Sequence, residues 1–371
     1  ISSSLGSLTT GSCEIASAID ANGGARFLTR GIAGEVETEG GLGYLAYDSA
    51  TGSTPDDLIA KAQDIILGTG ELGCGWEMPL EAMTRFLVDP NPYESLTEID
   101  NYLSPAGTDQ LLLQQRAAFL RPTSSIAVVM LSDENDCSID IGKQGYLVLR
   151  TEPFYRANAE CQNDPESECC TSCALAIDGC INEGCDGPNG PVYTPEEDPL
   201  GLRCYDQKRR YGVDFQYPTE RYVNALSQKT IDPQKATLAS PDASTQNPLF
   251  AGGRDPSQVT LLTFGGVPWQ DIAVAPFDAM SRYRTAAELD AAGAWSWITG
   301  KQPADPFMVE DTAIRSGTNP ATNEPVFATN SINLGDRPIP ASDFLQYACV
   351  FPLPEPIIQG QLPQRLVGPA P

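Results

Sequence analysis

The sequence predicts an α/β fold in which helices alternate with strands of a parallel sheet. The residues 126–131 form a continuous apolar run bounded by polar residues, which is typical of a strand buried on both faces, and the largely apolar stretch 258–267 is expected to be a second buried strand. Amphipathic segments that end at Gly or Pro precede the runs. Helix, breaker and buried strand is the order of an α/β domain, and 371 residues are enough to bury a large core.

The helices are predicted from their start signals and apolar spacing. Thr54 and Pro55, followed by two acidic residues, make a favourable start, because Thr caps the helix, Pro fits its first turn and the acids lie at the positive end of the dipole. Leu58, Ala62 and Ile66 share one side of this helix, and we expect that side to be buried. Further helices are expected over 77–88, 108–120, 218–226 and 278–289.

Composition divides the chain into four parts. The α/β domain is expected in two pieces, 1–137 and 211–299. Between them, 138–210 loses the alternation of helix and strand and holds most of the cysteines. We therefore expect a loop-rich insertion that disulfides hold, rather than a core. Prolines and short polar pieces dominate 300–371, which indicates an extended tail wrapped over the domain.

Charge and the absence of histidine exclude several functions. A formal charge of −26 repels phosphate backbones and anionic membranes and attracts divalent cations, so no nucleic-acid partner is expected. With no histidine, Ser-His-Asp and Cys-His catalysis and His-ligated zinc or haem are unavailable. The segment 68–73 matches the G-x-G-x-x-G pattern, but a helix rather than a strand precedes it, so we expect a loop and no nucleotide.

Six of the 11 cysteines lie in one short polar segment, which indicates disulfides and an oxidising compartment. The Cys-x-x-Cys spacing is also found in zinc sites, but two adjacent cysteines and the lack of histidine favour a disulfide knot. Because 11 is odd, at least one cysteine is free or pairs outside the chain. No run is long and apolar enough to span a membrane. Disulfides are predicted at Cys161, Cys169, Cys170, Cys173, Cys180, Cys185 and Cys204.

Side chains with oxygen donors directly follow the first apolar run. They are Ser132, Asp133, Asn135 and Asp136. They stand at the end of the predicted strand, and the carboxyl edge of a parallel sheet is where ligands bind. Mg²⁺ and Ca²⁺ prefer such hard oxygen donors, so the cluster is a candidate cation site. A solvated turn rich in Asp and Asn explains the same residues. Another alternative is a carboxylate hydrolase that uses Asp133, Glu134 and Asp136.

These residues also resemble a known family. The segment "VVMLSDENDCS", preceded by "TGELGCGWEMPLEAM", is similar to the von Willebrand factor A domain. The closer likeness is to a divergent branch of that family in secreted proteins and lipoproteins of myxobacteria and their relatives. The segments "RRYGVDFQYPTERYV", "RDPSQVTLLTFGGVPWQDIA" and "LQYACVFPL" look like blocks that recur in that branch. The resemblance therefore spans nearly the whole chain.

The resemblance implies a doubly wound, mostly parallel sheet with helices on both faces and a metal-ion-dependent adhesion site at its carboxyl edge. Asp133, after Ser132, matches the aspartate that follows the family's fourth strand. The family's threonine loop falls near 75–79, where no threonine stands, so Glu77 is the implied substitute and Thr69 a weaker one. The family's Asp-x-Ser-x-Ser motif does not occur in this chain. Either it lies upstream of Ile1, or the site is incomplete.

The leading hypothesis is a non-enzymatic interaction or adhesion module that works outside the cytoplasm, in the periplasm, on the outer-membrane surface or after secretion. The family resemblance implies Mg²⁺ or Ca²⁺ as the cation and a protein partner whose acidic residue completes the metal shell. The alternative is a structural subunit of a cell-surface assembly, homo- or hetero-oligomeric, that uses the fold as a scaffold without metal. The carboxylate hydrolase is the third hypothesis.

Overall fold

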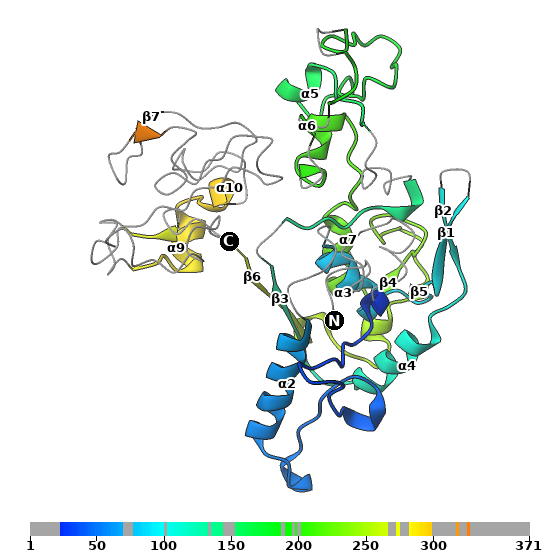
Figure 1. The fold of residues 1–371 in the computed structure, drawn as a ribbon, viewed down its shortest axis with the longest axis vertical. Coiled ribbons are helices and arrows are strands. Elements are labelled where there is room, and N and C mark those ends of the chain that lie inside the picture. The colour runs from blue at the N-terminus through cyan, green and yellow to red at the C-terminus, as the bar shows by residue number, and fades with distance from the viewer. Residues whose placement is uncertain are drawn as a thin grey trace. The chain divides into compact units, whose positions relative to one another are not determined.

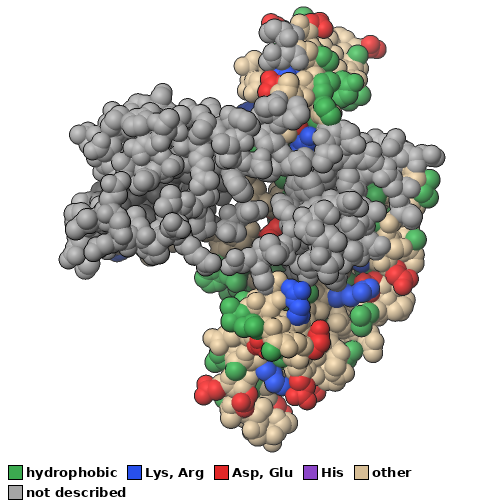
Figure 2. Space-filling model, in the orientation of Figure 1, with side chains coloured by type: hydrophobic (Ala, Val, Ile, Leu, Met, Phe, Trp, Pro, Cys, Tyr) green, Lys and Arg blue, Asp and Glu red, His purple; other side chains and the backbone are tan. Residues whose placement is uncertain are grey.

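The computed structural model describes residues 23–69, 77–99, 102–132, 135–143, 153–186, 190–194, 197–198, 202–265, 272–274, 282–298, 317–318 and 325–326. These residues belong to two compact units (Figure 1). Unit 1 lies within Ile1–Met130, Asn135–Val192 and Arg203–Thr263, and unit 2 within Leu131–Glu134, Tyr193–Leu202 and Phe264–Pro371. The fold is mixed α/β with disulfide-bonded cysteines. Acidic side chains are spread over the described surface (Figure 2), in keeping with the formal charge of −26.

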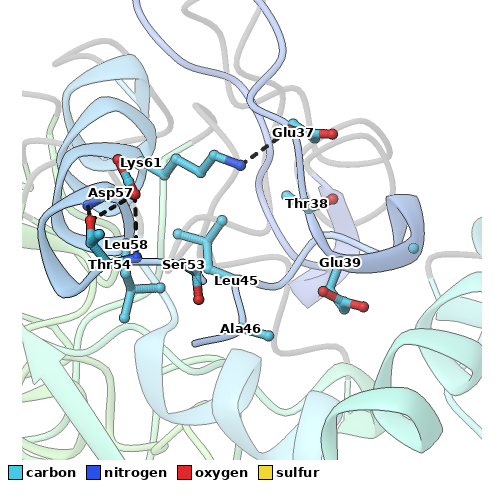
Figure 3. Close-up of a pocket in the computed structure, with 11 residues that line it drawn as sticks. Glu37, Thr38, Glu39, Leu45, Ala46, Ser53, Thr54, Asp57, Leu58 and Lys61 are labelled. Carbon is cyan, nitrogen blue, oxygen red and sulfur yellow. Dashed lines mark hydrogen bonds and ion pairs between the residues drawn. The ribbon is translucent and has the colours of Figure 1, made fainter. Parts of the chain in front are cut away.

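Helix α2 (Pro55–Thr69) begins where the sequence predicts. The Asp57 N–H donates to the Thr54 hydroxyl at 3.2 Å, and this hydroxyl donates to the Asp57 carboxylate at 2.7 Å (Figure 3). The exchange fixes the first turn, because it satisfies one of the amide groups that a helix start leaves open. It also lowers the pKa of Asp57, since the hydroxyl and the amide of Thr54 favour the ionised carboxylate.

The predicted burial of the apolar side of α2 is wrong. None of its residues is buried, and Ile66 is 61% exposed. The reason is that the segment beside the helix meets it through polar groups: Arg30 donates to the carbonyl oxygens of Gly68 and Thr69, both at 2.8 Å. Within the described residues, these hydrogen bonds and not apolar packing hold the end of α2.

Helices α3 (Pro79–Leu87) and α4 (Gln110–Phe119) form the centre of unit 1. Both lie within the ranges expected from the sequence. Met83 and Leu87 of α3 are buried, and Leu112 of α4 is fully buried. This matches the apolar spacing of the two segments.

An antiparallel hairpin, β1 (Ser95–Ile99) with β2 (Tyr102–Ala106), lies between these helices, and sequence reasoning missed it. Leu96 and Leu103 are its buried residues and form a small cluster with Tyr93. The sequence signal was weak, because the apolar residues of β1, Leu96 and Ile99, are three positions apart and not at the period of two that marks a strand.

Aromatic rings fill the space between α3 and α4. The ring of Phe27 lies 4.6 Å from that of Phe86 and 5.2 Å from that of Phe119, and Tyr44 lies 5.8 Å from Phe119. Tilted and edge-on pairs of this kind add to the free energy that burial of the rings supplies. The aromatic cluster therefore ties the segment before α2 to both central helices.

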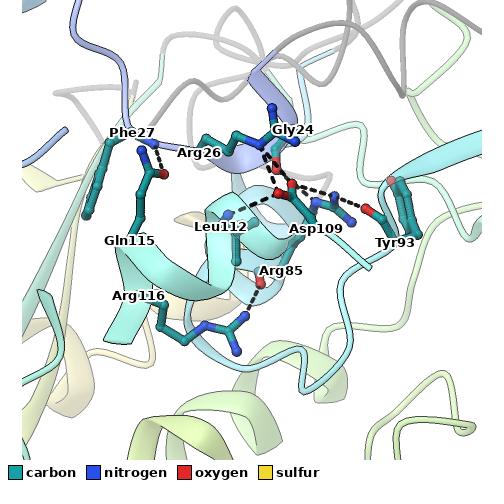
Figure 4. Close-up of polar contacts among 9 residues, drawn as sticks. All are labelled: Gly24, Arg26, Phe27, Arg85, Tyr93, Asp109, Leu112, Gln115 and Arg116. Carbon is teal, nitrogen blue, oxygen red and sulfur yellow. Dashed lines mark hydrogen bonds and ion pairs between the residues drawn. The ribbon is translucent and has the colours of Figure 1, made fainter. Parts of the chain in front are cut away.

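A buried charge network lies beside these rings (Figure 4). Asp109 is 2% exposed, and its carboxylate accepts the Leu112 N–H at 3.0 Å, which caps α4. The same carboxylate pairs with Arg26 at 2.9 Å and with the buried Arg85 at 3.5 Å. Arg85 also donates to the carbonyl oxygen of Gly24 at 2.8 Å. One carboxylate thus pairs with two guanidinium groups and starts a helix.

Arg116 completes the same region from α4 (Figure 4). Its guanidinium donates to the carbonyl oxygen of Arg85 at 2.9 Å and to that of Phe86, in the last turn of α3. These carbonyl groups have no hydrogen-bond partner within the helix, so the Arg116 guanidinium supplies the hydrogen bonds that water would otherwise donate. Burial lowers the pKa of Arg116 to about 10, which leaves the group charged at neutral pH.

A parallel strand pair carries the two apolar runs (Figure 1). The strands are β3 (Ile126–Leu131) and β6 (Val259–Phe264). Arg254, before β6, donates to the carbonyl oxygen of Ser124, before β3, at 2.7 Å. At the other ends, the Ser132 N–H donates to the Phe264 carbonyl oxygen at 3.0 Å. Because the starts lie together and the ends lie together, the two strands run in the same direction.

The prediction that these runs are buried on both faces is wrong for most of their length. Ile126 is buried, but Val129 is 55%, Leu131 65% and Phe264 63% exposed. Among the described residues this sheet has only these two strands. The side of β3 that carries Ile126, Val128 and Met130 is buried or half-buried, whereas the side that carries Val129 and Leu131 is exposed. Two parallel strands alone leave apolar side chains in solvent, which is unusual, since parallel sheets are normally covered on both sides.

Helix α7 (Glu220–Ser227) starts close to the position that Pro218 indicates, and Tyr222 is buried as expected, whereas Val223 is 61% exposed. The loop after α7 is fixed by the buried Asn247. Its amide donates to the carbonyl oxygens of Ala225 and Gln228, both at 2.9 Å, and so closes the end of the helix. A short antiparallel pair, β4 (Thr230–Ile231) with β5 (Thr245–Gln246), lies between α7 and Asn247.

The cysteine-rich part of unit 1 is mostly loop, as the sequence indicates. Its helices are one or two turns long: α5 (Glu160–Asn163) and α6 (Gln207–Tyr211). One buried cluster holds Ala157, Cys161 and Cys170, and the ring of Phe154 packs against those of Tyr211 and Phe215 at 4.9 and 5.4 Å. Disulfides add to the constraint that these small apolar clusters supply.

In unit 2 the helix predicted at 278–289 is shorter and later than expected. Helix α9 (Ala286–Ala291) begins after Thr285, and Tyr283 lies in an extended bridge with Ala273. A capping box at Thr285 sets this start. Residues 278–281 lie outside the described ranges. Helix α10 (Trp295–Ile298) follows, and then the antiparallel pair of β7 (Gly317–Thr318) with β8 (Pro325–Val326). Most of the predicted tail, 300–371, lies outside the described ranges. Among the helices of the described ranges, none has the length and apolarity to cross a membrane.

We predict that Asp109→Asn lowers the free energy of unfolding by about 3 kcal/mol, measured by urea denaturation. Asn can still accept the Leu112 N–H, so the loss reports the charge left on Arg85 rather than the helix cap. Lys61→Ala is the matched control, because its pair with Glu37 is exposed, and we expect a loss below about 0.5 kcal/mol. Equal effects of the two substitutions would contradict the role given to Asp109.

We predict that the Glu288 carboxyl stays ionised down to a pKa of about 2, measured by NMR titration. Arg282 and the Thr285 cap hydrogen-bond the carboxylate and so favour its charged form. Since the folded pKa lies below the usual value, the stabilisation of α9 is present above about pH 4.5 and is lost as the pH falls toward 2. Arg282→Met should raise this pKa toward 4.5, and an unchanged value would refute the assignment.

Candidate functional site

The carboxyl ends of β3 and β6 meet at Ser132, where its N–H donates to the Phe264 carbonyl oxygen. The Ser132 side chain is half-buried. Asp133 and Glu134, the next two predicted residues, lie outside the described ranges. The structure therefore places one predicted oxygen ligand, Ser132, at the carboxyl edge of a parallel pair, in unit 2.

Asp136 belongs to unit 1 and caps helix α3. Its carboxylate accepts the Leu80 N–H at 3.0 Å and the Ser138 N–H at 2.9 Å. Leu80 is the second residue of α3, so its amide has no partner within the helix, and a side chain 56 positions away supplies one. Burial raises the pKa of Asp136 above its ordinary value, and the amide hydrogen bonds oppose that rise.

The residues Asn135–Asp140, which we call the junction segment, hold several distant parts of unit 1. The Ser138 hydroxyl accepts the Glu81 N–H at 3.0 Å. The Cys137 N–H donates to the Glu77 carbonyl oxygen at 2.7 Å, and Cys137 forms a disulfide with Cys204. The predicted ligand Glu77 thus meets the junction segment through its backbone.

The junction segment also pairs with the chain that leads into α7. The Tyr217 N–H donates to the Ser138 carbonyl oxygen at 2.9 Å, and the Asp140 N–H donates to the Phe215 carbonyl oxygen at 2.8 Å. Between these bonds, Ile139 and Gln216 form an antiparallel bridge. The cap of α3 and the approach to α7 therefore share one short stretch of backbone.

A buried ion pair joins α3 to α7 beside this segment. The Arg221 guanidinium donates to both carboxylate oxygens of Glu81, each at 2.8 Å, and lies 4.0 Å from the centre of the Tyr217 ring. Burial raises the pKa of Glu81, and the charge of Arg221 opposes this. Burial also raises the pKa of Tyr222, and the Glu81 charge adds to that rise. Since each charged group has its partner, the cluster has a structural role and presents no free acid or base.

The described residues alone do not form a metal centre. Nowhere in the described ranges do three His, Cys, Asp or Glu side chains gather closely enough to hold a metal ion. Asp136 directs one carboxylate oxygen to each of two amide groups. Thr69, the weaker ligand candidate, donates its hydroxyl to the Ile66 carbonyl oxygen at 2.6 Å. The Ser132 hydroxyl and the carboxylate of Asp133, its neighbour in the sequence, are oxygen ligands of the kind that a hard cation prefers.

The eight cysteines that lie within the described ranges are joined in disulfides. Their four pairs are Cys161–Cys170, Cys169–Cys180, Cys173–Cys185 and Cys137–Cys204. The first three cross-link the short segment within itself, whereas the fourth connects the junction segment to the start of α6. Sequence reasoning included Cys204 among the bonded residues but could not choose its partner, because connectivity does not follow from spacing.

A surface cavity of about 330 Å³ lies between the start of α2 and the loop before it (Figure 3). Leu45, Ala46 and Leu58 give it an apolar part, and Lys61 reaches across to Glu37 at 3.2 Å. Of its charged groups on α2, Asp57 accepts the Thr54 hydroxyl at the helix start, and Lys61 forms the exposed pair with Glu37. The cavity therefore offers a mixed polar surface, and no group in it is poised for chemistry.

We compared the chain with protein-family models, with curated proteins and with solved structures, and none of the three comparisons found a match.

Sequence reasoning missed the residues that build the junction. Ser138, Glu81 and Arg221 act through contacts between positions far apart in the chain, and no local pattern marks them. One signal was available for Asp136: an Asp two residues before a Ser is a frequent turn pattern in which the carboxylate accepts the second amide. That pattern predicts the local bond to Ser138 but not the cap of α3.

We predict that Asp136→Ala lowers the free energy of unfolding by about 1–2 kcal/mol, because the Leu80 and Ser138 amides lose their acceptor. Asp136→Asn is the matched variant. Its single side-chain oxygen can accept only one of the two bonds, but the substitution also removes a buried charge, so we expect a loss smaller than that of Asp136→Ala. Chemical denaturation at neutral pH measures both. A loss in Asn as large as that in Ala would show that the charge, not the cap, is what matters.

Proposed function

We propose that this chain is a protein-interaction module of the extracytoplasmic space, built on a sheet of the von Willebrand factor A type. In this proposal Ser132 and Asp133 supply oxygen ligands for Mg²⁺ or Ca²⁺ at the carboxyl edge of the sheet. A carboxylate of the partner completes the metal shell. The role is one of binding, without catalysis.

The observation that carries the proposal is the parallel direction of β3 and β6, whose carboxyl ends meet at Ser132. In open parallel sheets this edge is where ligands bind, because the loops that leave it can be shaped without disturbing the strands. Ser132 is followed at once by Asp133 and Glu134 in the sequence. A hydroxyl and carboxylates at such an edge suit a hard divalent cation.

Four disulfides support the proposed location. Disulfides persist in oxidising compartments and are rare in the cytosol, where thiols are kept reduced. The loop-rich part of unit 1 has a small core and relies on them. A reducing compartment would remove this constraint, so we place the module in the periplasm, on a cell surface or in the external medium.

We predict one-site binding of Mg²⁺, Ca²⁺ or Mn²⁺ in a calorimetric titration at about 0.15 M ionic strength, where the general attraction of an acidic protein for cations is screened. Asp133→Ala should abolish this binding. Asp136→Asn is the control and should leave it intact, because the Asp136 carboxylate serves the cap of α3. Absence of binding in the wild type, or binding that survives Asp133→Ala, would overturn the cation part of the proposal.

A second candidate function is a structural subunit of a surface assembly that needs no metal. The exposed apolar side chains of the strand pair favour it, since Val129, Leu131 and Phe264 leave an apolar surface uncovered among the described residues. Sedimentation would distinguish the two candidate functions. If the protein self-associates, Val129→Asp abolishes this association and the protein binds no cation, the structural-subunit function replaces the leading proposal.

A further inference from the structure

Three aliphatic side chains stand out from the disulfide-bonded loop of unit 1. Leu175 is 54%, Ile177 38% and Ile181 82% exposed. We call these three residues the aliphatic tip. In Figure 2 hydrophobic side chains gather on the lobe that carries α5, beside acidic side chains. Single exposed apolar residues are ordinary, but three within seven positions of a polar loop form a patch that folding does not require.

The backbone that bears the aliphatic tip is held on both sides. Two disulfides, Cys169–Cys180 and Cys173–Cys185, enclose it. The Asn182 amide donates to the Leu175 carbonyl oxygen at 2.8 Å, so the two arms of the loop are joined directly. A surface fixed in this way loses little conformational entropy when it binds, and preorganised loops gain affinity for that reason.

The charges around the tip narrow the choice of partner. Asp178, between Ile177 and Ile181, is exposed, and so are Glu183 and Asp186. No lysine or arginine occurs in the sequence from 157 to 202, and the basic residues Arg156 and Lys208 of neighbouring segments meet the loop at Cys173 and Cys170, outside the positions 175–181 of the tip. An apolar patch with an acidic rim matches an apolar face flanked by Lys or Arg. The same rim opposes an anionic membrane surface, which attracts basic and repels acidic segments.

We propose that the aliphatic tip is a partner-binding surface of this chain, and that Ile181 and Leu175 pack on an apolar face flanked by basic residues on another protein. The inference rests on the proposed function only in treating the chain as a protein-interaction module. It needs no cation and does not involve Asp133. Contact at the tip follows the usual division of a binding surface, in which a few buried side chains supply affinity and the charged rim supplies selectivity and association rate.

The test uses the full chain and two synthetic amphipathic helices as probes. One has a leucine face flanked by lysine, and its counterpart has glutamate in place of lysine. Fluorescence anisotropy of the labelled peptides is measured at about 0.15 M ionic strength, where general charge attraction is screened. We expect the lysine peptide to bind, and Ile181→Asn to weaken its Kd roughly tenfold or more, since one buried aliphatic side chain is lost.

Two matched variants define the controls. Ile181→Val removes one methylene and should stay within about fourfold of the wild-type Kd. Val223→Asn alters another exposed aliphatic side chain, in α7, and should leave the Kd unchanged. Peptide mapping without reduction shows whether each variant keeps its disulfides.

Three results would overturn the inference: equal Kd values for the wild type and Ile181→Asn, equal binding of the glutamate peptide, or binding of phosphatidylcholine vesicles that Ile181→Asn abolishes. The last would identify the tip as a membrane contact. Failure here is separable from failure of the proposed cation site, because Asp133→Ala should leave peptide binding intact and Ile181→Asn should leave the cation titration intact.

Discussion

The organisation of unit 1 depends on the junction segment, Asn135–Asp140, and on the helix cap that it supplies. A helix start leaves amide groups without partners, and burial of α3 removes the water that would satisfy them. Asp136 and Ser138 accept these amides from a distant part of the chain. The same segment also pairs with the chain that leads into α7, and its Cys137 is bonded to Cys204. The position of α3 is therefore linked to the positions of α7 and of the chain around Cys204.

A second theme is the use of arginine in an acidic chain. Lys and Arg number 23 against 49 Asp and Glu, yet several arginines are buried rather than placed on the surface, among them Arg85, Arg116 and Arg254. They donate to carbonyl oxygens at helix ends and strand starts, for which a planar group with five N–H donors is well suited. Their withdrawal into the interior leaves the surface more acidic than the composition alone implies. That surface repels anions.

Local features were predictable from the sequence, and long-range ones were not. The start of α2 follows from Thr54 and Pro55, and strands β3 and β6 follow from an unbroken apolar run and from a largely apolar stretch. The exposure of Val129 could not be predicted. A run of apolar residues indicates that burial is favourable, but it does not show which helix or strand would cover those residues. Likewise, the acidic character of Asp136 was visible, but the Leu80 amide that it satisfies lies 56 positions away. The von Willebrand factor A resemblance and its metal site stay predictions, with Asp133 outside the described residues.

The most direct measurement of the junction's role is hydrogen exchange at single amides, in the wild type and in the Cys137→Ser, Cys204→Ser double variant. If the junction segment organises unit 1, the amides of Leu80, Cys137 and Tyr217 lose protection together, because they are bonded to or within this segment. The Cys180 amide, within the cross-linked loop, keeps its protection. Unchanged protection at Leu80 and Tyr217, or loss at only one of them, would contradict the claim that one segment holds these parts in place.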